Sequence, residues 1–351
     1  MPDLPRRHHT VPRFYLERFA DKGRITTVEL PGVRRFDQSV AKAAMHKDFY
    51  TLNTVDVNQS AFFEKVLGDM EDRAARIIRL VIEDDAWPLD PKSRAVLAEF
   101  AAAQYFRGPN QRRHTEQFAA TFLKAEISLQ GREGVVAYFK DRHGREITEK
   151  EADRLWAQAT TSNGPPIRVS ARTHMEQLAR LLPQMIRYFI GRPWLLLRYS
   201  GQSLCTSDTP VSIIPRNDHP PEMGVGLMNA WGLALPLSRE VGLLMGNPGP
   251  LMRALSYEAV AAGVADRLER PSQLPPSFFN TVTIANARRW IFCHPRDKSM
   301  IPSDLPEPCD QEILMPVDDF VELGQRIRSS TKRNPDKLLI TRCLTSVPQP
   351  K

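Results

Sequence analysis

The sequence predicts an α+β fold, in which a helical middle section packs on a mostly antiparallel sheet from the second half of the chain. Three observations carry this prediction. Up to about residue 193, apolar residues recur at helical spacing. Beyond it, short apolar runs alternate with turn residues, as in strands. The 29 prolines among 351 residues enforce many loop boundaries, so long uninterrupted helices should be few.

The first half is predicted to be mainly helical. An amphipathic helix is expected over 60–85, with Ser60 and Glu64 as its N-terminal cap. A second helix begins at Pro91, which suits a first helical position, and ends before Gly108. The other elements expected in this half are a helix over 12–19, strands over 24–30 and 49–52, and helices over 111–129, 148–160 and 171–190.

The second half is predicted to supply the sheet. Its apolar runs are short and bounded by turn residues, which favours strands of one sheet. These five strands are expected over 194–199, 203–206, 211–215, 232–237 and 241–245. Helices over 252–265 and 277–287 and a strand over 289–293 complete the prediction.

Length and pattern together predict one α+β domain over residues 1–300. Within it we distinguish an entry segment, a helical part and a strand-rich part. These cover residues 1–58, 59–192 and 193–300. Residues 301–351, rich in proline, are expected to form a peripheral tail.

The composition indicates which classes of protein the chain can belong to. The chain is 42% hydrophobic and 25% charged, which is typical of a globular domain. A net charge of +7 permits a nucleic-acid partner without requiring one. No apolar run approaches the roughly 20 residues of a membrane span, and no secretory signal opens the chain. The four cysteines lack C-x-x-C spacing, so we expect reduced thiols and a cytoplasmic protein.

Four motifs stand out along the chain. They are His8-His9-Thr10-Val11-Pro12-Arg13-Phe14-Tyr15-Leu16 with Phe19, Phe63-Glu64 with Glu71, Gln104-Tyr105-Phe106-Arg107-Gly108-Pro109, and Thr206-Ser207-Asp208-Thr209-Pro210-Val211. On these motifs the chain resembles the uncharacterised domain-of-unknown-function family numbered 4238, from residue 8 to about 293. The resemblance implies which residues matter more than what they do. Thr209 departs from the family, which more usually has Asn there.

His8 and His9 precede the short helix expected at Pro12. Neighbouring residues of an extended segment point to opposite sides, so one histidine should face inward and the other outward. The inward one is either a satisfied core histidine or a metal or acid–base residue.

Glu71 lies about 10 Å along its helix from Glu64, so at most one of the two can be a ligand. Its other interpretation is a half-buried partner in an ion pair.

Gln104 and Arg107 interrupt an apolar helix face. They follow Leu97 and Phe100 at spacings of 3, 4 and 3, where core residues would be expected. A buried guanidinium must meet a carboxylate, helix-end carbonyls or a bound anion.

Asp208 has two interpretations. It either bonds the backbone of its own turn or supplies the carboxylate of a polar centre. Nucleophilic catalysis by the preceding serine is not expected, because no Gly-x-Ser-x-Gly surrounds it.

Two functions are open at this point. The first is a metal-assisted hydrolase, such as a nuclease, acting on phosphodiesters, with one divalent ion on His9, Glu71 and Asp208. The catalytic residues would be His8, His9, Gln104, Arg107 and Asp208, gathered in one pocket at the helix–sheet junction. The second is a non-catalytic nucleic-acid-binding protein whose buried polar network is structural. The partner would be nucleic acid or another phosphate-containing ligand, and no membrane partner is expected.

Overall fold

A computed structural model describes the chain in nine segments. They are residues 7–47, 57–108, 110–117, 119–120, 132–160, 171–201, 203–218, 224–270 and 274–308. The chain divides into two compact units, one of residues 1–113 and 169–311 and the other of 114–168 and 312–351. The α+β class is confirmed. The predicted domain boundary at residue 300 stays a prediction, and the strand expected over 49–52 lies outside the described residues.

The larger unit contains a five-stranded sheet of order β10-β5-β9-β8-β7. Its pairs are antiparallel except β10 with β5. Every residue of β8 and β9 is buried, as expected for central strands covered on both faces. The strands are β5 (Trp194–Arg198), β7 (Ser212–Ile214), β8 (Gly232–Pro236), β9 (Val241–Met245) and β10 (Arg267–Glu269).

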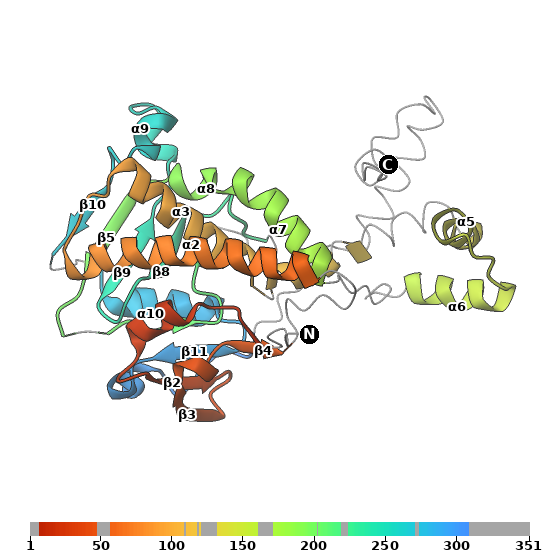
Figure 1. Ribbon diagram of the computed structural model, residues 1–351, viewed down its shortest axis with the longest axis horizontal. Helices are drawn as coiled ribbons and strands as arrows, with labels where there is room; N and C mark the ends of the chain where they lie inside the picture. Colours follow the sequence, from red (N-terminus) through yellow and green to blue (C-terminus); the bar gives the residue numbers. More distant parts are fainter. Residues whose placement is uncertain are drawn as a thin grey trace. The chain divides into compact units, whose positions relative to one another are not determined.

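Helices α2 (Val57–Glu83) and α3 (Pro91–Phe106) pack on each other and lie across this sheet (Figure 1). Leu97 and Phe100 of α3 join the same apolar core as the sheet strands. Asp90 caps α3, because its side chain accepts the backbone N–H groups of residues 92 and 93. Helices α7 (Ala171–Met185) and α8 (Arg187–Ile190) pack on α3 and on each other.

A second sheet has the order β3-β2-β11-β6. It corrects the prediction of one sheet over 194–245, because β6 (Thr206–Ser207) pairs with β11 (Trp290–Cys293) instead of its sequence neighbours. The reason is tertiary: the Tyr15 hydroxyl lies 2.9 Å from Thr206 Oγ1, which holds β6 beside the first helix. The remaining strands are β2 (Arg24–Glu29) and β3 (Arg34–Ser39).

The described residues begin with the short elements β1 (Arg7–His9), α1 (Arg13–Leu16) and η1 (Glu17–Phe19). Strand β1 pairs with β4 (Met45–Lys47), and α1 continues into the 3₁₀ turn η1. Helix α10 (Pro276–Asn286) contacts strands of both sheets and so joins them. A 3₁₀ turn, η2 (Val40–Lys42), links β3 to β4, and another, η4 (Pro295–Met300), follows β11.

Two predicted helices differ from the structure. Helix α2 begins at Val57, so Ser60 lies inside it and is not its cap. The helix expected over 252–265 is replaced by η3 (Gly249–Leu251) and the short α9 (Tyr257–Ala261). The Ser256 side chain starts α9 by accepting the N–H of residue 259, and Gly263, with φ of +86°, follows its end.

The described part of the smaller unit includes the helices α5 (Arg132–His143) and α6 (Glu149–Thr160). Val135 is buried there against Phe139, Leu155 and Trp156. Helix α6 matches the helix predicted over 148–160. Helix α5 was not predicted, because its apolar residues form one run instead of recurring at helical spacing.

Candidate functional site

An ion pair joins the second and third motifs. The Arg107 side chain is 1% exposed, and its Nη1 donates to Glu71 Oε1 at 2.5 Å. Arg107 lies at the C-terminal cap of α3, where a cation also interacts favourably with the helix dipole. The Glu71 side chain is 26% exposed, so the pair lies at the margin of the core. Of the partners considered for this guanidinium, the structure shows the carboxylate of Glu71.

The first motif reaches the same place through the backbone. Arg107 Nε donates to the carbonyl oxygen of Thr10 at 2.8 Å. Thr10 is in turn fixed by its backbone N–H and its hydroxyl, which both donate to the carbonyl of Ala44. The segment that follows His8 and His9 is therefore bound to the end of helix α3 through Arg107.

His9 lies within electrostatic reach of this pair. Burial lowers its pKa, the Ala43 backbone and Glu71 act in the opposite direction, and Arg107 lowers the pKa further. Within the described residues its Nδ1 atom is buried and makes no hydrogen bond. The imidazole is therefore neutral at neutral pH. It could accept a proton or a hydrogen bond.

Gln104 lies one turn before Arg107 and is 3% exposed. Neither atom of its amide group makes a hydrogen bond to the residues that the structure describes. A buried amide in this condition costs free energy, so Gln104 is the least satisfied member of the cluster.

His174 of α7 is a member that the sequence analysis missed. It is 3% exposed, and burial lowers its pKa to about 4, although a hydrogen bond with the Arg107 backbone raises it. The sequence contains a pattern that could have found it, since His174 precedes Leu178 and Leu182 at spacings of four on one helix face. We name the group of His9, Glu71, Gln104, Arg107 and His174 the α3 cluster.

The α3 cluster has no surplus positive charge. Its guanidinium is matched by one carboxylate, and burial keeps both imidazoles neutral. A phosphate placed there would have to compete with Glu71 for Arg107. Across the described segments, no group of three or more His, Cys, Asp or Glu side chains is arranged to hold a metal ion. The ion predicted on His9, Glu71 and Asp208 stays a prediction.

Asp208 has a different set of partners. Its carboxylate accepts the backbone N–H groups of Arg288, Arg289 and Trp290 at 2.9, 3.0 and 3.2 Å. It is 3% exposed, and burial raises its pKa to about 6 against the lowering effect of these three hydrogen bonds. Asp208 therefore bonds to backbone groups, as one of its two interpretations expected. These groups belong to the segment that enters β11 and not to the turn of Asp208 itself. Ser207 does bond its own turn, at Thr209.

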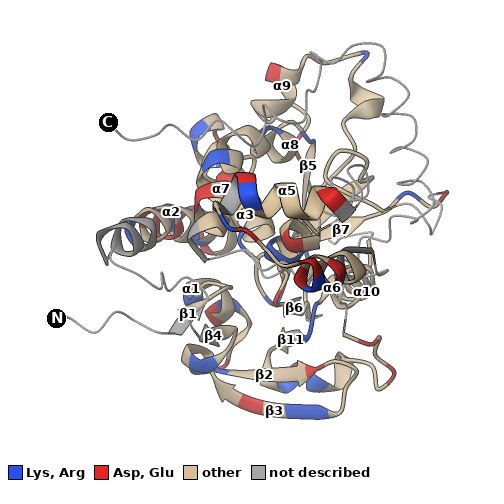
Figure 2. Cartoon of the chain, turned by 90° about the vertical axis from the view of Figure 1, so that its right-hand side faces the viewer, with Lys and Arg blue, Asp and Glu red and all other residues tan. Residues whose placement is uncertain are grey.

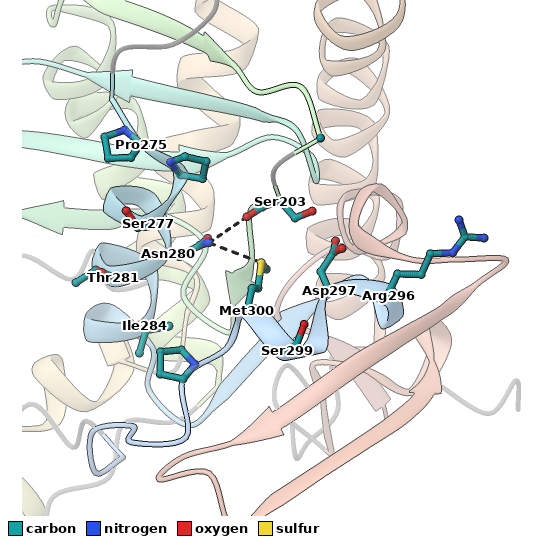
Figure 3. A pocket seen from close by; sticks show the side chains of 13 residues that line it. Ser203, Pro275, Ser277, Asn280, Thr281, Ile284, Arg296, Asp297, Ser299 and Met300 are labelled. Carbon is teal, nitrogen blue, oxygen red and sulfur yellow. Dashed lines mark hydrogen bonds between the residues drawn. The ribbon is translucent and has the colours of Figure 1, made fainter.

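Asn280, on helix α10, also bonds backbone. Its Oδ1 accepts the N–H of Cys205 at 2.9 Å and its Nδ2 donates to the carbonyl of Ser203 at 3.0 Å. Figure 3 shows Asn280 in the wall of a cleft of about 520 Å³, together with Asp297 and Met300. None of the predicted site residues lines this cleft.

The structure thus brings four of the six predicted site residues into one cluster and gives Asp208 separate partners. His8 pairs through its backbone with His46, and its side chain lies outside the described residues.

The comparisons with known proteins add a family and nothing further. A family model described as a protein of unknown function (DUF4238) matches residues 7–297. The searches of curated proteins and of solved structures returned no match. In the described residues, no helix is both long and apolar enough to cross a membrane.

Proposed function

The chain belongs to DUF4238, a family of proteins of unknown function, and we propose that it is a non-catalytic protein that binds nucleic acid. In this proposal the motif residues hold the fold and a basic surface makes the contact. The observation that carries it is the Asp208 carboxylate. Its three hydrogen bonds within the described residues go to the backbone N–H groups of residues 288–290. A carboxylate so engaged acts as a structural acceptor.

The basic surface lies where β3 and β11 flank β2. Arg34 and Arg289 are 64% and 59% exposed and share one carboxylate, Glu29. Figure 2 shows Lys and Arg positions along β3, together with one acidic position. Exposed guanidiniums in excess over carboxylates attract phosphates.

The metal-assisted hydrolase is the competing proposal, and the cluster charges favour it less. Arg107, which would steady a phosphate, is already paired with Glu71, and Asp208 is occupied by backbone donors. We propose a cytoplasmic location. Cys205 and Cys293 fit it, because both are buried free thiols whose pKa burial raises.

The test is a titration of the protein into fluorescein-labelled 12-nucleotide DNA and RNA at several salt concentrations in EDTA. We expect saturable binding whose logarithm falls linearly with the logarithm of salt. For single strands, Arg34→Gln should reduce the slope by about 0.7 if that residue meets one phosphate, whereas Arg216→Gln, at an exposed arginine paired with Asp218, should leave it unchanged.

The same mixtures are then incubated with Mg²⁺ or Mn²⁺ and run on denaturing gels. We expect the oligonucleotides to stay intact. Cleavage that needs a divalent ion would overturn the proposal in favour of the hydrolase. A lack of binding at low salt would overturn nucleic acid as the partner.

A further inference from the structure

Two aromatic rings lie on one face of the second sheet. Phe36 is opposite Thr27, Arg34 is opposite Glu29, and Trp290 is opposite Glu29 on its other side. Directly opposed residues of antiparallel strands point to the same face. The ring centroids of Phe36 and Trp290 are 6.3 Å apart in an edge-to-face arrangement, and both residues are partly buried.

A guanidinium covers each ring. Arg34 Cζ lies 5.4 Å from the centroid of Phe36, and Arg289 Cζ lies 5.3 Å from the centroid of Trp290. Both distances are within the range of cation–π contact. We call these four residues the arginine–aromatic patch.

Glu29 fixes the two arginines of the patch. Its Oε1 accepts from Arg289 Nε at 2.9 Å and Nη2 at 2.5 Å, and its Oε2 accepts from Arg34 Nη1 at 3.3 Å. The Glu29 side chain is only 12% exposed, so the acceptor is anchored in the sheet. One carboxylate against two guanidiniums leaves the patch positively charged.

Asp208 fixes the backbone under the patch. Its hydrogen bonds to the backbone of residues 288–290 fix the main chain from which the side chains of Arg289 and Trp290 project. The backbone carbonyl of Arg289 accepts the N–H of Leu30, which fixes the main chain at this residue further. A surface held in this way loses little conformational entropy when a ligand binds.

We propose that the arginine–aromatic patch binds the unpaired bases of single-stranded nucleic acid. This inference rests on the proposed function and names its ligand and its site. Aromatic rings and guanidinium planes stack on the π-face of any base, and the charge of Arg34 and Arg289 suits the adjacent phosphates. A duplex keeps its bases stacked inside, so it can use the charges but not the rings. Charge complementarity favours this occupant over an uncharged peptide.

The test compares four single substitutions in the full chain. Phe36→Leu keeps an apolar side chain but removes a π-face, and Trp290→Ala removes the other ring. Trp290→Phe retains a ring in case Trp290→Ala fails to fold. Trp231→Ala is the matched control, because Trp231 is 43% exposed outside the patch. Thermal melts establish that each variant is folded before binding is measured.

The probes are a labelled 12-nucleotide single strand and a labelled 12-base-pair duplex, read by fluorescence anisotropy. We expect Phe36→Leu and Trp290→Ala to weaken single-strand binding by about 5- to 150-fold. Duplex binding should change by less than about twofold for the same variants, and Trp290→Phe should keep most of the single-strand affinity.

Three results would overturn the inference. If the ring variants weaken binding of the single strand and of the duplex equally, or weaken neither, the rings do not stack on bases. Nucleic-acid binding itself would then still stand. If the wild type binds neither probe, the inference fails together with the proposed function. If the patch variants lose binding only to a proline-rich peptide included as a third probe, the occupant is a protein segment.

Discussion

Helix α3 carries a buried arginine near each end, and the two are satisfied to different degrees. Arg94, in the first turn, and its partner Asp266 are both 0% exposed. Arg107, about 20 Å further along the axis, pairs with Glu71, which is 26% exposed. The first site is closed inside the core, whereas the second lies at its margin.

The Arg94 side chain uses all five of its donors. Two go to Asp266, at 2.7 and 3.1 Å, and three go to the main-chain carbonyls of Ile190, Arg192 and Ala261. Its guanidinium also lies 4.1 Å from the ring centroid of Trp194. By contrast, the α3 cluster includes the amide of Gln104, which bonds to nothing in the described segments. From this difference we infer that the complete hydrogen-bond network of Arg94 contributes more to stability than the incomplete network of the α3 cluster. Substitutions in the α3 cluster should therefore destabilise the fold less.

The largest expected effect is at the closed end. Arg94→Met should lower the free energy of unfolding by about 3–5 kcal/mol, because it leaves the buried Asp266 carboxylate without its cation. Arg107→Met should cost about half as much, since Glu71 can regain water. Urea unfolding of both variants measures this, and an equal or larger loss for Arg107→Met would break the comparison.

His174 gives the α3 cluster a pH dependence. Its pKa is about 4 in the folded chain, against 6.5 for an unperturbed histidine, because burial disfavours the charged form. As pH falls below 6.5, the unfolded chain takes up a proton that the folded chain refuses until about pH 4. Stability should therefore drop by about 3 kcal/mol across that window. Urea unfolding at several pH values should show a smaller drop for His174→Leu, and parallel losses would contradict the assignment.

Asp208→Asn should cost about 2 kcal/mol. Both carboxylate oxygens accept backbone N–H groups, so the amide of Asn would turn one acceptor into a donor facing another donor. Asp218→Asn is the matched control, because that side chain is 72% exposed and its change should be negligible. Thermal melts would contradict this role for Asp208 if the two variants unfolded at the same temperature.

The smallest effect is expected at Gln104. Gln104→Met keeps the length of the side chain and removes a buried amide that has no partner in the described part of the chain. Stability should stay within about 1 kcal/mol of the wild type or rise slightly. A loss above about 2 kcal/mol in urea unfolding would mean that the amide makes hydrogen bonds that stabilise the fold.

The sequence predicted what depends on local pattern. The change of periodicity near Pro193 located the sheet, and Pro91 located the start of α3. Arg107 was expected to need a carboxylate, helix-end carbonyls or a bound anion because its helix face is apolar, and Glu71 supplies a carboxylate. Arg94 was missed although it lies three residues before Leu97 on the same face, because a cation near a helix end usually reaches solvent.

What depends on distant pairing could not be predicted. The second sheet joins Ser207 to Ile291 and Thr26 to Cys293, and no local pattern encodes such partners. Strand β3 has one apolar residue, Phe36, among six, so its periodicity was too weak to indicate a strand. The ring pair with Trp290 followed from neither segment alone.

The central claim is that the α3 cluster is structural and takes no part in binding, while the arginine–aromatic patch makes the contact with nucleic acid. The most direct test is the affinity of an Arg107→Met/Glu71→Gln variant for a labelled single strand. It is measured under conditions in which circular dichroism shows that the variant is folded. We predict a Kd within about twofold of the wild type. A loss of more than about tenfold in a folded variant would contradict the account and place binding at the α3 cluster.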